Sequence, residues 1–319
     1  MTRPVIWIAR RLSDATLARA ERDYDIIVNH DDIPYDRADI IAMSAKVDGM
    51  IACHSEHFTA DIVAALDSRL KIVANYSVGT DHCDLAAFAA RGIVVTNTPD
   101  VLSDATAEIS LLLMLGAARR AVEGDRMVRD GDWDFWSPSF MVGKQVTGAR
   151  LGIVGMGRVG QAMARNARGL EMDVHYYNRN PLPDDLAQGA TYHDSLESLL
   201  PLSDFLSLHC PATPQTRGMM TAEKFAMLPD GAVFVNVARG ALVDETALMA
   251  ALNTGKLAAA GLDCFVTEPG GNPALSKYDN VFMLPHIGSS TGATRDAMGF
   301  RALDNLDAFF AGNRPRDLL

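Results

Sequence analysis

Short apolar runs rich in β-branched residues alternate with amphipathic stretches along almost the whole chain. The first series contains VIWIA, DIIVN, DGMIAC, LKIVANY and IVVTN, at residues 5–9, 25–29, 48–53, 70–76 and 93–97. The second contains LGIVG, DVHYYN, DFLSLHC, AVFVNVA, AAGLDCF and VFMLPH, at residues 151–155, 173–178, 204–210, 232–238, 259–265 and 281–286. Strands that are apolar throughout and separated by helices are typical of parallel sheets covered on both faces. The pattern therefore predicts two doubly wound α/β domains, which suits a chain of 319 residues.

The segments between and after the two series indicate how the domains are connected. DVLSDATAEISLLLMLGAARRAVEGD, at 100–125, predicts one long helix with Ser103 or Asp104 as its N-cap. TGATRDAMGFRALDNLDAFFAGN predicts a helix after the last strand, and we expect it to return to the N-terminal domain. The expected division is 1–99 with 288–319 for the first domain and 100–287 for the inserted second domain.

Composition and charge narrow the classes of partner. Hydrophobic residues make up 48% and charged residues 22% of the chain, which are ordinary values for a globular protein. The net charge of −11 argues against nucleic acid or an anionic membrane surface as a partner. The longest apolar stretch, ISLLLMLGAA, is too short to span a bilayer, and the first residues lack a secretory-signal pattern. With four scattered cysteines and no CxxC pair, we expect a cytoplasmic protein with reduced thiols.

A glycine-rich turn, GMGRVG, lies between the first strand and the first helix of the second series. Gly155 permits the tight turn, Gly157 lets a pyrophosphate approach the backbone, and Gly160 allows helix and strand to pack closely. The free N–H groups and partial positive charge at the start of the helix suit phosphates. We therefore expect a dinucleotide site here; the alternative is a glycine-rich connector without a ligand.

The strand that follows ends in Asn178 and Arg179, where dinucleotide-binding folds usually place an acidic residue. An acidic side chain there would bind both ribose hydroxyls of NAD and repel a 2′-phosphate. Asn178 removes that repulsion, and the guanidinium of Arg179 is a forked donor suited to phosphate. The pair predicts NADPH in preference to NADH. The sequence NRNP is also good turn chemistry, so a solvated Arg179 is the alternative.

Three polar residues follow later strands of the second series: Arg239, Glu268 and His286. Open α/β sheets bind ligands beyond the carboxyl ends of their strands. An arginine can hold a 2-keto acid through two hydrogen bonds, and an imidazole paired with a carboxylate can protonate the alkoxide that forms as a coenzyme delivers hydride. Each residue alone has a structural alternative, since Glu268 can belong to a polar turn and His286 to a hydrogen-bonded strand end. Only the three together favour a catalytic site.

Five segments jointly resemble the D-isomer-specific 2-hydroxyacid dehydrogenase family over essentially the whole chain. They are GMGRVGQAMA, LHCPATPQTRGMM, FVNVARGALVDETAL, GLDCFVTEP and LPHIGSST. The resemblance implies a Rossmann nucleotide-binding domain inserted into a flavodoxin-like substrate-binding domain. It also implies that Arg239 binds the substrate, that Glu268 pairs with His286, and that His286 is the general acid and base.

The resemblance implies further contacts with substrate and coenzyme. In NYSVGTDHCDL, the backbone N–H groups of Val78 and Gly79 would bind the substrate carboxylate. Asp263 would contact the nicotinamide carboxamide, and Thr106 would lie near the nicotinamide ribose. The remaining expected coenzyme contacts are Arg158, Val159, Cys210, Pro211 and Thr216.

Cys53, His54 and His57 are close together in the sequence ACHSEHF. No fourth ligand lies nearby at a usual spacing, so we expect no metal site. We expect instead that this strand-end loop faces the substrate and that His54 or Ser55 contacts it. His82 is expected to order the neighbouring loop.

The segment GDWDFWSPSFMVGKQVTGARLGIVG resembles the glyoxylate/hydroxypyruvate reductase branch of the family. The resemblance implies a homodimer in which Trp136 reaches the partner's active site while Trp133 and Phe140 pack at the interface; simple interface packing of these aromatic residues is the alternative. We expect NADPH-dependent reduction of glyoxylate to glycolate and of hydroxypyruvate to D-glycerate. The alternatives are a reductase of a bulkier 2-keto acid, such as 2-ketogluconate or an aryl pyruvate, and a non-catalytic nucleotide-sensing protein of the same fold.

Overall fold

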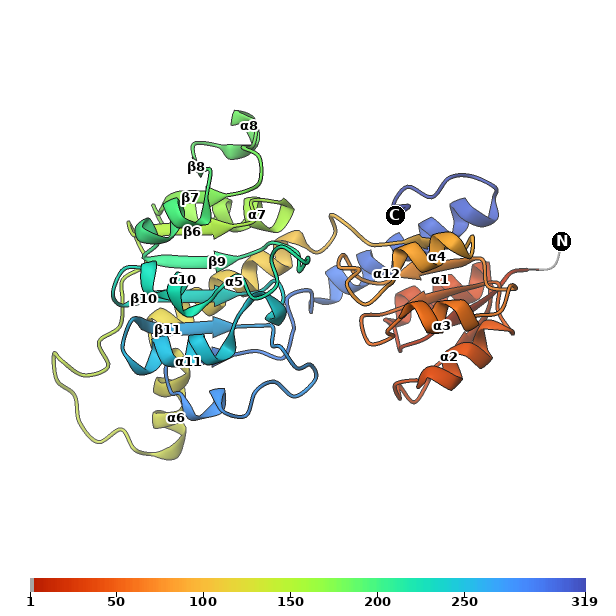
Figure 1. Ribbon diagram of the computed structural model, residues 1–319. Helices are drawn as coiled ribbons and strands as arrows, with labels where there is room; N and C mark the ends of the chain where they lie inside the picture. Colours follow the sequence, from red (N-terminus) through yellow and green to blue (C-terminus); the bar gives the residue numbers. More distant parts are fainter. Residues whose placement is uncertain (1–2) are drawn as a thin grey trace. The chain divides into compact units, whose positions relative to one another are not determined.

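The chain folds into two compact units, seen in a computed structural model that describes residues 3–319. One unit contains the chain up to Leu102 together with Ser290–Leu319, and the other contains Ser103–Ser289 (Figure 1). The sequence predicts the two crossings near residues 99 and 288. Across the described residues, none of the helices combines the length and hydrophobicity that a bilayer span requires.

The first unit is built on a five-stranded parallel sheet in the order β2-β1-β3-β4-β5. Its strands are β1 (Val5–Ile8), β2 (Asp25–Val28), β3 (Gly49–Ala52), β4 (Ile72–Asn75) and β5 (Val94–Thr96). This order is that of flavodoxin-like doubly wound sheets. The central strands β3 and β4 are buried along their whole length, which explains why they are apolar on both faces.

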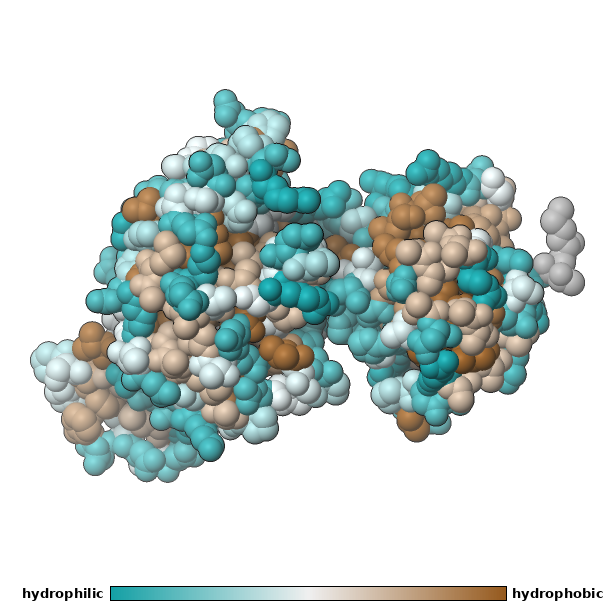
Figure 2. Space-filling model, in the orientation of Figure 1, coloured by the Kyte–Doolittle hydropathy of each residue, from teal (hydrophilic) through white to brown (hydrophobic). Residues whose placement is uncertain are grey.

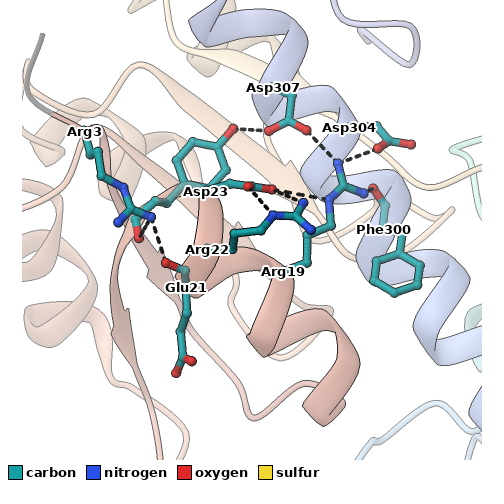
Figure 3. A network of polar contacts seen from close by, with 9 residues as sticks. Arg3, Arg19, Glu21, Arg22, Asp23, Phe300, Asp304 and Asp307 are labelled. Carbon is teal, nitrogen blue, oxygen red and sulfur yellow. Dashed lines mark hydrogen bonds and ion pairs between the residues drawn. The ribbon is translucent and has the colours of Figure 1, made fainter.

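The helices of the first unit include one from the far end of the chain. They are α1 (Asp14–Asp23), α2 (Arg37–Ser44), α3 (Ala60–Ala65), α4 (Leu85–Ala90) and α12 (Gly292–Phe310). Arg19 of α1 pairs with Asp304 and Asp307 of α12 at 2.7 and 2.6 Å, and Tyr24 donates to Asp307 (Figure 3). Leu303 and Leu306 of α12 are fully buried in the same core as β1. The C-terminal helix is therefore an integral part of this unit.

The second unit contains a seven-stranded parallel sheet in the order β12-β11-β10-β9-β6-β7-β8. Its strands are β6 (Arg150–Val154), β7 (Asp173–Tyr177), β8 (Thr191–His193), β9 (Phe205–Leu208), β10 (Ala232–Asn236), β11 (Leu257–Leu262) and β12 (Val281–Met283). The chain order reverses between β6 and β9, which is the switch point at which Rossmann sheets bind dinucleotides. The glycine-rich turn follows β6 directly.

The second unit also contains helices on and around this sheet. They are α5 (Ser103–Ala118), α6 (Ala121–Asp130), α7 (Arg158–Arg168), α8 (Asp184–Ala187), α9 (Leu196–Leu199), α10 (Ala222–Met227) and α11 (Glu245–Asn253), with short 3-10 helices at Leu200–Leu202, Gly240–Leu242 and Leu275–Lys277. The core on one side of the sheet is built from α5 and α7, and that on the other from α9, α10 and α11.

The prediction of one helix over 100–125 is wrong. α5 ends at Ala118 and α6 begins at Ala121, because Arg120 between them has a left-handed backbone with φ 56°. The guanidinium of Arg120 bonds to the Glu123 carboxylate in the first turn of α6 at 2.6 and 2.9 Å. α5 begins at Ser103 itself, so neither Ser103 nor Asp104 is its N-cap.

Candidate active site

The packing around the turn between β6 and α7 explains its glycines. Gly155 has φ 95°, and a Cβ there would lie 2.6 Å from the backbone nitrogen of Cys210. A Cβ on Gly160 would lie 2.4 Å from the carbonyl oxygen of Gly155. Around Gly157, by contrast, residues 3–319 place no atom within 4 Å of the Cβ position apart from the glycine itself and the adjoining residues of its own segment. Gly157 is the N-cap residue of α7, so open space adjoins the first N–H groups of the helix, as a phosphate requires.

Asn178, just beyond β7, is tied to this turn. Its Oδ1 accepts a hydrogen bond from the backbone N–H of Met156 at 2.7 Å. Tyr192 donates its hydroxyl to the carbonyl oxygen of Asn178 at 3.3 Å. The neighbouring Arg179 is exposed. A neutral side chain therefore braces the glycine turn, and a cation stands next to it at the surface.

The loop after β9 carries Cys210, Pro211 and Thr216, and its start touches Gly155. The Thr216 hydroxyl donates to the carbonyl oxygen of Pro211 at 2.7 Å and accepts from the N–H of Thr213 at 2.8 Å, which closes the loop. Burial raises the pKa of the Cys210 thiol to about 11. The thiol is therefore protonated at neutral pH and acts as an apolar wall beside the turn.

Asp263 lies just beyond β11 and is 1% exposed. Its two carboxylate oxygens accept hydrogen bonds from the N–H groups of Ile287 and Gly288, both at 2.8 Å. Burial raises the pKa of this carboxyl, although the two backbone donors oppose the shift. A Cβ on Gly288 would lie 3.2 Å from both the Asp263 carboxylate and the Thr106 side chain. The structure thus brings together Thr106, Asp263 and the segment after β12.

Glu268 and His286 are directly hydrogen-bonded. The distance between Nδ1 of His286 and Oε2 of Glu268 is 2.6 Å. The other carboxylate oxygen, Oε1, accepts from the N–H of Phe265 at 2.7 Å, which orients the carboxylate. Because an ionised carboxylate only accepts, the hydrogen in this bond is on Nδ1 of His286. His286 has φ 53°, an uncommon backbone conformation that fixes where the ring leaves the chain.

Arg239 lies just beyond β10, against the loop that carries Glu268. A Cβ on the next residue, Gly240, would lie 1.8 Å from the carbonyl carbon of Phe265, so the two segments are in direct contact. The guanidinium of Arg239 donates to the Ala238 carbonyl oxygen at 2.7 Å. The ends of the adjacent strands β10, β11 and β12 therefore bring a cation, a carboxylate and an imidazole to the same edge of the sheet.

Two supporting residues were missed in the sequence. Asn236 is 1% exposed, and its side chain donates to the Arg239 carbonyl oxygen at 2.9 Å and accepts from the Ala238 N–H at 3.0 Å. Glu245 accepts from the N–H of Val266 at 3.0 Å and from the Asn272 side chain at 2.8 Å, which ties down both ends of the Glu268 loop. The polar Asn236 within AVFVN was the available signal, whereas Glu245 is indistinguishable in sequence from an ordinary helix start.

Val78 and Gly79 lie in the first unit, beyond the carboxyl end of β4. Their carbonyl oxygens accept from the side chains of Asn97 and Asn75, each at 3.0 Å. His82 is 5% exposed and bonds through Nε2 to Oδ1 of Asn75 at 3.0 Å, which orients that amide. Residues 3–319 supply no acceptor for the N–H of Val78 or Gly79. These two donors are therefore presented in a loop whose carbonyl groups are held in place.

His54 lies beyond β3, with Nε2 4.0 Å from the Asp81 carboxylate and its ring centroid 5.2 Å from that of His82. Cys53 does not join His54 and His57 in a metal-ligand cluster. Its backbone N–H bonds to the buried Glu56 carboxylate at 2.7 Å, and burial raises the pKa of its thiol. The donor cluster that has a metal-binding spacing in residues 3–319 lies in the second unit instead and consists of Cys264, Glu268 and His286.

The segment after α6, residues 131–147, extends from the body of the second unit as a long loop (Figure 1). Trp136 is 74% exposed and Trp133 56% exposed. The ring of Phe135 packs edge-on against Phe140 at 4.9 Å. Figure 2 shows hydrophobic residues at the surface where this loop lies. Aromatic residues exposed together at a surface are typical of interaction sites.

Known proteins resemble the chain over its whole length. Residues 111–288 match the D-isomer specific 2-hydroxyacid dehydrogenase, NAD binding domain. The chain is 41% identical to glycerate dehydrogenase of Hyphomicrobium methylovorum over 98% of both chains. It is 39% identical to glyoxylate reductase of Thermococcus kodakarensis, over 99% of this chain and 96% of the relative. The chain belongs to the D-isomer specific 2-hydroxyacid dehydrogenase family.

Solved structures of this family share the fold. A glyoxylate reductase from Paecilomyes thermophila is 30% identical, with a TM-score of 0.90 over 100% of this chain and 99% of the other. An NADPH-dependent glyoxylate/hydroxypyruvate reductase from Sinorhizobium meliloti, solved with NADP and malonate, is 32% identical, with a TM-score of 0.87 over 100% and 97%. The expected family and the expected pair of parallel-sheet domains are confirmed. As a family member the protein is an NAD(P)-dependent oxidoreductase that uses a nicotinamide coenzyme.

Proposed function

We propose that the protein is an NADPH-dependent reductase of glyoxylate and hydroxypyruvate, forming glycolate and D-glycerate. The observation that carries the proposal is the 2.6 Å bond between His286 and Glu268, formed beside Arg239 at the carboxyl edge of the nucleotide-binding sheet. Relatives named glycerate dehydrogenase and glyoxylate reductase support a small 2-keto acid as substrate. The second unit would bind the coenzyme, and the first would contribute to substrate binding.

Each of the proposed catalytic and substrate-binding residues would have a separate role in the reduction. Arg239 would hold the carboxylate and the carbonyl oxygen of the keto acid and polarise the carbonyl. His286 would give the proton on Nε2 to that oxygen, and Glu268 would stabilise the imidazolium that donates it. The N–H groups of Val78 and Gly79 would bind the substrate carboxylate, with His54 as a further contact. When bound, the reduced nicotinamide supplies the hydride.

The coenzyme site would use the residues around the glycine turn. Arg158 and Val159 are the first two residues of α7, and their N–H groups would bind the pyrophosphate. Asp263 and Thr106 would lie beside the nicotinamide half, and Cys210, Pro211 and Thr216 beside the adenosine half. Asn178 and Arg179 support NADPH, since an uncharged side chain and a cation stand where an acid would repel a 2′-phosphate.

The exposed aromatic segment supports a homodimer. Trp133 and Trp136 would be covered by a second copy, with Trp136 limiting substrate size in the partner. Sedimentation velocity tests this: the wild-type chain should sediment as a dimer and the Trp133→Ser/Trp136→Ser double variant as a monomer. The free cysteines found among residues 3–319 suit the reducing cytoplasm, which we propose as the location.

A steady-state panel of keto acids with NADPH and NADH tests the function. We expect glyoxylate and hydroxypyruvate to give the highest kcat/KM. A preference for phenylpyruvate or 2-ketogluconate would favour a bulkier substrate, and coenzyme binding without turnover would indicate a sensing protein. His286→Asn should lower kcat by about 10²–10⁴-fold, whereas His30→Asn, at an exposed position, should leave it unchanged. Arg239→Ala should impair both KM and kcat, because its contact persists from bound substrate to transition state.

A further inference from the structure

Cys264 lies next to the Glu268–His286 pair. A sulfur, a carboxylate oxygen and an imidazole nitrogen of these residues all lie within 4.8 Å of one another. Cys264 is 2% exposed, and the other two residues are half-buried. Residues 3–319 contain no second group of histidine, cysteine and acidic side chains with this spacing. One sulfur, one oxygen and one nitrogen donor suit Zn²⁺ and its softer analogue Cd²⁺.

The three donors lie in loops that follow two paired strands of the sheet. Cys264 and Glu268 follow β11, and His286 follows β12, which pairs with β11 in parallel. Bonds of about 2.0–2.3 Å to a tetrahedral Zn²⁺ separate its ligand atoms by roughly 3.3–3.8 Å. The sulfur therefore needs to approach by about 1.5 Å at most from the 4.8 Å outer limit of the cluster, while the imidazole and carboxylate must move apart from 2.6 Å.

We propose that Cys264, Glu268 and His286 form an inhibitory site for a soft divalent cation, Zn²⁺ in the cell. The metal takes the place of the proton between Glu268 and Nδ1 of His286. The thiol, which donates to the Ala238 carbonyl oxygen at 3.4 Å, releases its proton to solvent. A neutral His286 ring transfers its Nδ1 proton to Nε2 through solvent, and an imidazolium releases it, so the bound ring is neutral imidazole in both cases. Water fills the remaining coordination position.

Occupation of this site would stop proton donation. A ring with a metal on Nδ1 is held as neutral imidazole and cannot become the imidazolium that donates from Nε2. Binding rests on the geometry of the three side chains alone. Inhibition rests in addition on the proposed role of His286 as general acid, so the two parts are tested separately.

Binding is tested with Cd²⁺ on the protein without substrate, read as the ultraviolet charge-transfer band of a Cd²⁺–thiolate bond. We expect one equivalent of Cd²⁺ to saturate the band and Zn²⁺ to displace it. Cys264→Val should lose the band, and His286→Asn should weaken binding by at least about tenfold. Cys53→Ala is the matched control, because Cys53 has His54 and His57 as sequence neighbours. Loss of the band in Cys53→Ala but not in Cys264→Val would overturn the site.

Inhibition is tested by following NADPH oxidation with glyoxylate as Zn²⁺ is added and then removed with a chelator. Each rate is divided by the metal-free rate of the same variant, so a change in basal rate cancels. The inhibition constant should rise at least about tenfold in Cys264→Val, and Mg²⁺ and Ca²⁺ should have no effect, since they prefer all-oxygen sites. Equal inhibition of the wild type and Cys264→Val would overturn the proposal. Stoichiometric binding without inhibition would retain the site but overturn its inhibitory role and the assignment of His286 as the acid.

Discussion

We expect the preference between NADPH and NADH to depend on the side chain of residue 178. Oδ1 of Asn178 accepts the Met156 N–H at 2.7 Å, and an aspartate oxygen in the same place accepts that bond equally well. Asn178→Asp therefore adds one negative charge while the glycine turn keeps its brace. The variant tests the proposed 2′-phosphate position with little structural change.

The expected magnitude follows from the surroundings of this side chain. Two unit charges about 5 Å apart interact by roughly 0.8 kcal/mol in water and by about 3 kcal/mol at an effective dielectric constant of 20. Asn178 is half-buried and Arg179 beside it is exposed, so the value lies between these limits. Because a phosphate monoester carries about −1.5 to −2 charges, the new carboxylate should weaken NADPH binding by about 1.5–3 kcal/mol. This corresponds to about a 10- to 150-fold loss in kcat/KM.

The assay is kcat/KM for NADPH and for NADH at a fixed, saturating glyoxylate concentration. The NADPH/NADH ratio should fall in Asn178→Asp by at least that factor, because the carboxylate also accepts from the ribose hydroxyls of NADH. The matched control is Asn180→Asp, which adds the same charge at an exposed position two residues away. A ratio that changes by less than about threefold, or equally in both variants, would refute the reasoning.

Three further substitutions test the site and the fold. Glu268→Gln places an amide against Nδ1 of His286 and removes a charge-assisted bond worth about 1.5–3 kcal/mol, so kcat for glyoxylate reduction should fall by about 10- to 150-fold; an unchanged kcat would contradict the pairing. Asn75→Ala removes the amide that holds the Gly79 carbonyl, and KM for glyoxylate should rise by about tenfold while KM for NADPH stays the same. Asp204→Asn breaks a pair of hydrogen bonds from Arg150 at 2.9 and 3.0 Å, which hold the pKa of that carboxyl below 3.8. Urea unfolding at pH 7 should show a loss of about 0.5–1 kcal/mol, since the pair is partly exposed, and this difference should disappear as the pH falls through the lowered pKa; a constant difference down to pH 2 would contradict it.

The alternation of apolar runs was sufficient to predict the strands of both sheets, with one exception. The missed strand is β8, three residues at the edge of the second sheet, where little burial is required. Predicted strands extend too far at their carboxyl ends: the run to residue 265 corresponds to β11, which ends at Leu262. Asp263 and Cys264, the first residues beyond β11, are buried as its strand residues are, but they bond to loops rather than to a neighbouring strand. An apolar run in the sequence indicates that residues are buried, not that they are paired in a sheet. Burial continues past the ends of the strands, so the predicted strands are too long there.

Contacts between distant segments were the part that sequence could not supply. Arg239, Glu268 and His286 were found because each follows a recognisable strand. Of their two supports, Asn236 bonds to Ala238 and Arg239 in its own segment, so its polarity within an apolar strand was a usable signal. Glu245 is an ordinary helix-start residue whose partners, Val266 and Asn272, lie in another segment. The metal-ligand cluster was missed for the same reason. Spacing along the chain pointed to Cys53, His54 and His57 in ACHSEHF, whereas Cys264, Glu268 and His286 come from loops after two different strands.

Asp263 and Cys264, just beyond β11, belong to two different proposed sites, because consecutive side chains of an extended chain point in opposite directions. Asp263 turns towards Gly288 and Thr106, on the proposed nicotinamide side, and Cys264 turns towards Ala238 and the Glu268–His286 pair. Packing alone does not require sulfur at position 264, since a valine has similar volume and polarity. What sulfur adds is the third donor that converts a proton-sharing pair into a metal-binding group. Replacing the Cys264 sulfur should therefore remove inhibition by a soft cation while the residues proposed for catalysis stay in place.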